Sequence, residues 1–139
     1  MSLPDEYDLR RSLPSPEAFA RLREAAEMAP RSAEGIDRGL PNSLFGVTVV
    51  HRSTGETVGM GRVVGDGATV YQISDMAVHP DHQGAGLGTA ILTALDAWID
   101  ETAPPNAYVN LLADVDGFYE RFGYEETRPA SKGMFRRTE

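Results

Sequence analysis

The spacing of apolar and polar residues predicts a chain in which strands alternate with helices. Short runs rich in β-branched residues indicate strands, and apolar positions recurring every three or four residues indicate helices. We expect strands at residues 7–13, 44–52, 57–64, 69–78, 108–113, 124–127 and 134–137. Helices are expected between Pro16 and Pro30, within 31–41, between Leu87 and Pro104, and at 116–122. The order is therefore β-α-α-β-β-β-α-β-α-β-β.

The three central strands and the long helix define the expected fold. Turn-forming residues at 53–56 and 65–67 join the three strands into an antiparallel meander. The long helix repeats apolar residues at positions 87, 91, 94, 95, 98 and 99, a stripe suited to packing on a sheet. A meander that continues through a helix to another strand predicts an α/β fold, of the α+β type, with a mixed sheet and helices on both faces.

Composition narrows the class of protein. A chain of 139 residues with 41% apolar and 24% charged residues is expected to form a single domain, residues 1–139. It has no apolar run long enough to span a membrane, and its acidic N-terminus resembles no signal peptide, so we expect a cytoplasmic protein. The net charge of −8 disfavours nucleic acid and membranes as partners, although acidity can equally serve solubility alone.

The most informative segment is a glycine-rich turn, Gln83-Gly-Ala-Gly-Leu-Gly88, between an apolar strand and a helix. Such a turn lets backbone N–H groups approach a phosphate, and the helix N-terminus adds unsatisfied donors. The spacing does not fit a P-loop, which requires a lysine, or the dinucleotide fingerprint, because Thr89 stands where a third glycine is required. It does fit the pattern Q/R-x-x-G-x-G/A.

This pattern and a second motif resemble the GCN5-related N-acetyltransferases, the GNAT superfamily. Gln83, Gly86 and Gly88 occupy the positions of the family's acetyl-CoA signature, within a strand–loop–helix segment at residues 76–92. Residues 117–125, Gly-Phe-Tyr-Glu-Arg-Phe-Gly-Tyr-Glu, resemble the family's short helix that carries a tyrosine and precedes a strand. The resemblance covers the second half of the chain and implies a GNAT-like fold.

The resemblance also implies an activity. Enzymes of this family transfer an acetyl group from acetyl-CoA, a cosubstrate, directly to a primary amine in a ternary complex, and no metal is expected. Direct transfer agrees with the absence of cysteine, which excludes an acyl-cysteine intermediate and a zinc–thiolate site. The expected acceptor is a small-molecule or peptide amine. The alternative is a non-catalytic module that binds acyl-CoA.

By resemblance, acetyl-CoA lies along the strand and the loop. Loop amides would hold its pyrophosphate, and the backbone of Met76 and Val78 would pair with its pantetheine arm as an added strand would. Gly86 and Gly88 are expected to be glycine because a Cβ would meet the phosphates or the sheet. The expected cofactor-binding residues are Met76, Ala77, Val78, Gln83, Gly84, Ala85, Gly86, Leu87, Gly88, Thr89 and Phe118.

Two residues are expected to carry the chemistry. Tyr119 would protonate the departing coenzyme A thiolate; otherwise it packs beside the neighbouring phenylalanines. Asp75 is the first candidate for the base that deprotonates the amine, because burial in an apolar strand should raise its pKa. It could instead order a loop by hydrogen bonds. Asp114 and Asp116 are further candidates for this base, although the first interpretation of Asp116 is that it is a helix N-cap.

Residues outside these motifs complete the expected site. His79 and His82 lie just before the glycine-rich turn; they lack the third ligand of a metal site, but His82 could touch a phosphate. The last two strands would leave a sheet edge through which a homodimer could form. The acceptor pocket is expected between the N-terminal helices and the last strands, lined by Phe19, Arg23, Met28, Arg31 and Phe45.

Overall fold

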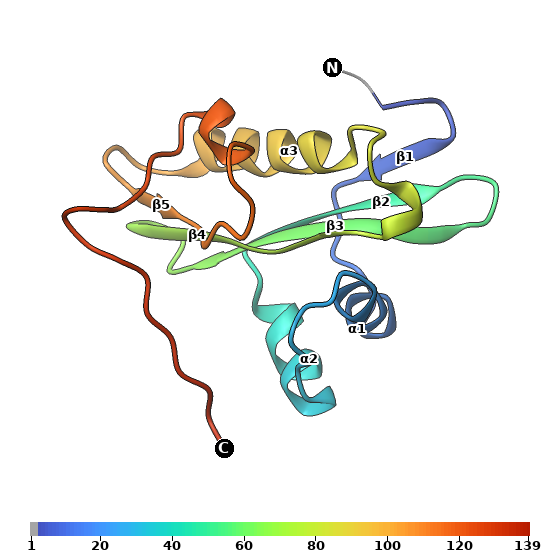
Figure 1. Ribbon diagram of the computed structural model, residues 1–139, viewed down its shortest axis with the longest axis horizontal. Coiled ribbons are helices and arrows are strands. Elements are labelled where there is room, and N and C mark those ends of the chain that lie inside the picture. Colours follow the sequence, from blue (N-terminus) through green and yellow to red (C-terminus); the bar gives the residue numbers. More distant parts are fainter. Residues whose placement is uncertain (1–2) are drawn as a thin grey trace.

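The structure, a computed structural model that describes residues 3–139, is built on one mixed sheet (Figure 1). Its strands are β1 (Tyr7–Arg10), β2 (Phe45–His51), β3 (Glu56–Gly65), β4 (Val70–Val78) and β5 (Tyr108–Asn110). They lie in chain order across the sheet; pairing is antiparallel from β1 to β4 and parallel between β4 and β5. The predicted meander and mixed sheet are therefore confirmed.

Helices cover both faces of this sheet, as the sequence predicts. α1 (Pro16–Ala25) and α2 (Ala33–Gly39) lie on one face, and α3 (Leu87–Thr102) lies on the other (Figure 1). Three short 3₁₀ turns complete the chain: η1 (Leu40–Asn42), η2 (Pro80–His82) and η3 (Tyr119–Phe122). The side chain of Ser15 caps α1 by accepting a hydrogen bond from the amide of Ala18 at 3.1 Å. No helix within residues 3–139 combines the length and apolar character needed to cross a membrane.

Each helical layer buries its own apolar cluster against the sheet. Burial of such side chains is the main favourable term in folding, so the two clusters fix the sheet between its helices. The cluster under α3 includes Val47, Val49, Val58, Val63, Tyr71, Ile73, Ile91, Leu92 and Leu95. The cluster under α1 and α2 consists of Phe19, Leu22, Ile36, Leu40, Met60 and Ala77.

A glycine in β3 allows α3 to lie close to the sheet. A Cβ at Gly61 would lie 2.8 Å from Cγ2 of Ile91 and 3.0 Å from Cδ1 of Leu95. We expect Gly61→Ala to lower the free energy of unfolding by about 1–3 kcal/mol, because helix side chains must move to relieve this overlap. Chemical denaturation measures the change. Gly39→Ala is the control, since a Cβ there meets nothing within 4 Å, and equal losses in both variants would contradict the prediction.

The strand β4 contains a bulge that the sequence did not predict. Asp75 and Met76 together lie opposite a single residue of β3, Gly61. The flanking register pairs are Met60 with Ala77 and Arg62 with Ser74. Asp75 has a φ of +57°, in the left-handed region that residues other than glycine rarely adopt. The strand therefore carries one more residue than regular pairing allows.

The bulge changes the face that each later side chain of β4 reaches. Tyr71 and Ile73, before the bulge, belong to the cluster under α3, whereas Ala77 belongs to the cluster under α1 and α2. Regular alternation would place all three on one face. Met76 and Val78, which follow the inserted residue, pack on the α3 side instead.

The second half of β4 also lacks a neighbouring strand on one side. β5 pairs with β4 only at residues 70–72 of β4. Within residues 3–139, no strand pairs with residues 73–78 along that edge. A bulged strand bends, which separates its end from the parallel neighbour. The sheet is therefore open between β4 and the segment that follows β5.

The C-terminal segment is where the predicted secondary structure is wrong. Residues 124–127 and 134–137 form no strand, so the last two strands of the predicted order are not present. Met134 and Phe135 are 83% and 80% exposed. Strand propensity expresses packing on neighbouring strands, and these residues have no strand to pack on. The sheet edge that was expected to support a homodimer is thus not formed by these strands.

Two smaller differences concern the segment between β5 and the C-terminus. β5 spans three residues rather than the six that were expected, and the helix expected at 116–122 is the shorter turn η3. Phe118, not Asp116, is the residue before η3, so the prediction of Asp116 as an N-cap is wrong. The end of η3 is as expected: Gly123 closes it with a φ of +89°.

Candidate active site

A cleft of about 430 Å³ lies where the free edge of β4 meets the glycine-rich loop and η3. Its lining comes from two separate stretches of the chain: residues 76–89, which run from the end of β4 through the glycine-rich loop to the start of α3, and residues 114–119. The lining residues are Met76, Ala77, Val78, His82, Gln83, Gly84, Gly86, Leu87, Gly88, Thr89, Asp114, Val115, Phe118 and Tyr119. All the residues expected to bind the cofactor are among them except Ala85, which packs against the α3 core. Tyr119 lies in the same cleft.

The loop at the start of α3 presents bare backbone to this cleft. Gly84 and Gly86 have φ values of +85° and +86°, a backbone conformation that favours glycine. Gly86 precedes the first turn of α3 and offers it no side-chain cap. The amides of that first turn have no partner within the helix and are free to bind an anion.

Gly88 is small for a different reason. It lies inside the first turn of α3, and a Cβ there would lie 3.6 Å from Cζ of Phe118, an ordinary contact. Of the two expected neighbours of a Cβ at this position, the sheet is therefore wrong, and contact with the phosphates stays a prediction. Gly88 lines the cleft, so a side chain there would instead occupy space next to the loop amides.

The loop is tied to the end of β4. Nε2 of Gln83 donates a hydrogen bond to the carbonyl oxygen of Val78 at 3.2 Å. The signature glutamine therefore fixes the loop against the strand, and the carbonyl of Val78 is already engaged. The backbone of β4 before Val78 is the part of this edge that faces the cleft without a strand partner.

Tyr119 closes the far wall of the cleft. Its side chain is 9% exposed, and its ring packs edge-on against Phe118, with ring centroids 5.0 Å apart. Tyr119 lines the cleft, and its hydroxyl makes no hydrogen bond to any residue in the described range 3–139. Burial raises the pKa of the Tyr119 hydroxyl, and the nearby Asp114 carboxylate raises it further. The group therefore retains its proton and can donate it.

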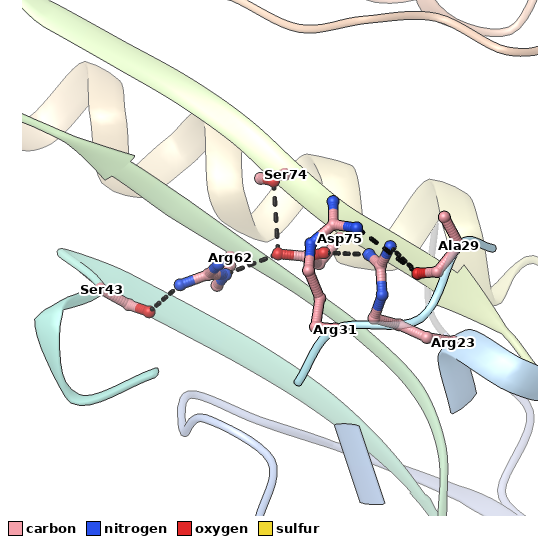
Figure 2. Close-up of polar contacts among 7 residues, drawn as sticks. All are labelled: Arg23, Ala29, Arg31, Ser43, Arg62, Ser74 and Asp75. Atoms are coloured by element: carbon pink, nitrogen blue, oxygen red, sulfur yellow. Dashed lines mark hydrogen bonds and ion pairs between the residues drawn. The ribbon is translucent and has the colours of Figure 1, made fainter. Parts of the chain in front are cut away.

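Asp75 lies on the other face of β4 and does not line the cleft (Figure 2). Its side chain is 5% exposed and lies between two arginines. Oδ1 accepts a hydrogen bond from Nη1 of Arg23, and Oδ2 accepts one from Nε of Arg62 at 2.6 Å. The burial was expected, but the two guanidinium groups were not. The structure does not bring Asp75 together with Tyr119.

Each of the two arginines also donates a hydrogen bond to a residue of the α1–α2 layer. Nη2 of Arg23 donates to the carbonyl of Ala29 at 2.6 Å, and Nη1 of Arg62 donates to Oγ of Ser43 at 3.0 Å (Figure 2). Burial lowers the pKa of Arg23, Asp75 opposes this shift, and nearby Arg31 adds to it. The cluster therefore links β3 and β4 to the layer formed by α1 and α2.

Four of the five residues expected to line an acceptor pocket lie together on the α1–α2 side of the sheet. Phe19 and Arg23 are buried residues of α1, and Cζ of Arg23 lies 5.8 Å from the centroid of the Phe19 ring. Met28 packs against the same cluster, and Arg31 is exposed beside Arg23. Phe45 lies on the opposite face of the sheet, stacked on Trp98 with ring centroids 4.9 Å apart. An expected pocket that includes Phe45 is therefore wrong.

Other acidic residues and histidines have different positions relative to the cleft. Asp114 is its only lining carboxylate in the described range 3–139, and Asp116 does not line it. His82 lines the cleft and His79 does not. Residues 3–139 contain no group of three His, Cys, Asp or Glu side chains that could hold a metal ion.

Comparison with known families identifies the fold and its class of enzyme. A family model described as an acetyltransferase (GNAT) domain matches residues 44–126. This range runs from β2 through η3 and includes every residue of the cleft. The chain belongs to the GNAT acetyltransferase family. It is accordingly an acyltransferase.

Individual relatives agree with this assignment. A solved structure from meticillin-resistant Staphylococcus aureus, described as a protein of unknown function and probable acetyltransferase, is 37% identical with a TM-score of 0.89. The match covers 95% of this GNAT chain and 99% of that one. An uncharacterized N-acetyltransferase of Pyropia yezoensis is 25% identical over 117 residues, 83% of this chain and 67% of its own. A GNAT acetyltransferase from Brucella melitensis, solved in complex with acetyl-CoA, shares the fold at 20% identity, with a TM-score of 0.63 over 86% of this chain and 82% of its own.

The sequence contains one signal from which the ion-paired cluster could have been predicted. Arg62 stands in the apolar strand β3 just as Asp75 stands in the apolar strand β4. Two opposite charges within neighbouring buried strands predict a pair, because neither is stable in an apolar layer alone. By contrast, the sequence gives no comparable signal that Val115 reaches the cleft.

Proposed function

We propose that this GNAT protein is an acetyl-CoA-dependent N-acetyltransferase that transfers the acetyl group directly to a primary amine. The observation that carries the proposal is that one cleft is lined by the glycine-rich loop, the free edge of β4 and Tyr119. The loop suits a pyrophosphate, the edge suits the amides of an extended pantetheine arm, and the hydroxyl suits a leaving thiolate. We propose Met76, Ala77, Gly84, Gly86 and Gly88 as the main backbone contacts.

The proposed reaction proceeds in a ternary complex. The lone pair of the neutral amine forms a bond to the thioester carbonyl carbon, and the carbon–sulfur bond then breaks. The thiolate takes the proton of the Tyr119 hydroxyl, and the amine nitrogen loses its extra proton to a carboxylate or to water. Tyr119 recovers its proton from solvent through the open cleft. The raised pKa of Tyr119 keeps it protonated before each turnover.

We propose Asp114 rather than Asp75 as the carboxylate that receives the amine proton. Asp114 lines the cleft with Tyr119, whereas both oxygens of Asp75 already accept hydrogen bonds from guanidinium groups on the other face of β4. The acceptor is proposed to be a small-molecule or peptide amine, attracted in part by the net charge of −8.

Ligand binding followed by turnover tests the function. Thermal shifts are measured with acetyl-CoA, CoA, NADH and ATP, since a ligand that binds only the folded state stabilises it by about 2.7 kcal/mol at a hundredfold excess over Kd. We expect shifts with acetyl-CoA and CoA alone, followed by release of free thiol when primary amines are added. No shift with either coenzyme, or a larger shift with NADH or ATP, would overturn the proposal.

Gly88 provides a variant that separates folding from binding. Alanine there makes only an ordinary contact with Phe118 and is a better helix former than glycine, so we expect unchanged or higher stability. Its methyl group would enter the cleft beside the loop amides, and we expect Gly88→Ala to weaken acetyl-CoA binding at least about tenfold. Calorimetric titration measures this, with Gly39→Ala as the control. Wild-type affinity in Gly88→Ala would show that the phosphates bind elsewhere.

A further inference from the structure

All three histidines of the chain gather beside the glycine-rich loop. The ring of His82 lies 4.9 Å from the ring of His51 and 6.0 Å from the ring of His79, measured between centroids. Tyr7 from β1 completes the group, with its ring 5.6 Å from that of His82. The GNAT signature does not include these residues, and nothing in the transfer chemistry derived above uses them.

His82 is the member of this group that lines the cleft. Among the described residues that line the cleft, none is lysine or arginine, and the one carboxylate, Asp114, is repulsive to anions. Coenzyme A carries several negative phosphate charges, and the protein carries a net charge of −8. Without a contribution from His82, backbone amides alone would have to offset the repulsion between these phosphates and the acidic protein. His82 is thus the side chain of the cleft best suited to a phosphate.

A hydrogen bond joins Tyr7 to His82, and its direction decides which nitrogen of His82 is available. Oη of Tyr7 lies 2.7 Å from Nδ1 of His82. Tyr7 is 6% exposed, and its hydroxyl hydrogen needs an acceptor, which Nδ1 provides. A neutral imidazole that accepts at Nδ1 carries its hydrogen on Nε2. Nε2 has no hydrogen-bond partner within residues 3–139, so this N–H group is free to bind a ligand.

We infer that His82, oriented by Tyr7, binds a phosphate of coenzyme A through its Nε2–H group. The inference rests on the proposed function, because it assumes that coenzyme A occupies this cleft. Tyr7 acts as a positioning residue: it fixes the tautomer and so supplies a donor whether or not the imidazole is charged. Hydrogen bonds to charged groups are stronger than neutral ones, so one such contact has a measurable effect on affinity.

Calorimetric titration of His82→Ala with coenzyme A is the first test. We expect Kd to rise about tenfold or more, whereas the Kd of pantetheine, which has no phosphate, stays within about twofold of wild type. His82→Gln should recover part of the affinity, because its side-chain amide can also donate. His79→Ala is the matched control, since His79 belongs to the same cluster but does not line the cleft.

Different outcomes separate the failure of this inference from the failure of the proposed function. Wild-type protein that does not bind coenzyme A would overturn the function itself. Wild-type binding with an unchanged Kd in His82→Ala would overturn only the role of His82. Equal losses in His82→Ala and His79→Ala, or an equal loss with pantetheine, would also overturn it, because they would indicate a distorted loop rather than a lost phosphate contact.

Tyr7→Phe tests the positioning role through a pH profile of coenzyme A affinity. Histidine changes charge between about pH 5 and 8, and the charged ring carries hydrogens on both nitrogens. We therefore expect Tyr7→Phe to weaken binding above pH 8, where the tautomer is no longer fixed, and to have little effect near pH 5.5. An equal loss of coenzyme A affinity at both pH values would overturn the positioning role of Tyr7. The groups next to His82 are Tyr7 from β1, His51 from β2 and His79, the residue before η2. Glu6 lies near Tyr7 and Asp81 near His79, and all of these groups except Tyr7 are unchanged between the two proteins.

Discussion

Replacing Tyr119 with phenylalanine is expected to lower kcat about a hundredfold, because general acid catalysis contributes roughly 10²–10⁴-fold. The ring would keep its contacts with Phe118 and Tyr124, and only the hydroxyl in the cleft would be lost. We therefore expect the Kd of acetyl-CoA and the thermal stability to stay near those of wild type. Steady-state release of thiol with a good amine acceptor measures kcat, and calorimetry measures Kd.

The pH dependence of kcat gives a second test of Tyr119. A tyrosine ordinarily loses its proton near pH 10, and burial together with Asp114 raises the pKa of Tyr119. The protonated acid therefore persists to higher pH, and we expect wild-type kcat to fall on the alkaline side only above that range. Tyr119→Phe should lack this alkaline limb.

Tyr124→Phe is the matched control for Tyr119. Tyr124 contacts Tyr119 but does not line the cleft, and its hydroxyl donates to Oδ1 of Asp96 at 2.6 Å. We expect this variant to lose some stability and to keep kcat. If Tyr119→Phe kept wild-type kcat at every pH, or if Tyr124→Phe lost as much, the acid role of Tyr119 would be wrong.

Replacing Asp75 with asparagine is expected to lower the free energy of unfolding by about 3–5 kcal/mol, the usual cost of removing one partner from a buried ion pair. Arg23 would keep its charge in a site where its side chain is 5% exposed, and Arg62 would lose the acceptor of its Nε at 2.6 Å. Urea denaturation measures the change. A fall of roughly 10 °C or more in Tm should accompany it.

Asp8→Asn is the matched control, because Asp8 also contacts two arginines but lies at the surface. Its side chain is 37% exposed, with Arg10 at 2.9 Å and Arg52 at 3.9 Å. Surface pairs contribute little, so we expect a loss below about 1 kcal/mol. If Asp75 were instead the catalytic base, Asp75→Asn would keep near wild-type stability and lose rate, most strongly at low pH.

The parts of the fold that the sequence predicted depend on local signals. Ser15 and Pro16 mark the start of α1, the apolar stripe of α3 marks its buried face, and short turns mark the meander. Each of these is determined by residues within a few positions of one another. The glycine-rich loop is of the same kind, because its conformation follows from Gly84 and Gly86.

The parts that were missed depend on residues distant in sequence. Residues 134–137 were expected to form a strand, but strand formation requires a neighbour that pairs with them, and sequence alone does not supply one. The partners of Asp75 come from β3 and α1, 13 and 52 positions away. The bulge at Asp75 likewise depends on pairing with β3, so its effect on the two faces of β4 was not predictable from periodicity.

The bulge has a consequence for how the length of this chain can change. Deleting Asp75 or Met76 would restore regular alternation, and Ala77 and Val78 would keep their present partners in β3 and their present faces. Asp75, however, would either be absent or take the place opposite Gly61 on the α3 face, away from Arg23 and Arg62. The ion-paired cluster would be lost in one step. The exposed turn at residues 52–55 carries no such constraint, so insertions and deletions can accumulate there while the segment from Ile73 to Gly84 keeps a fixed number of residues.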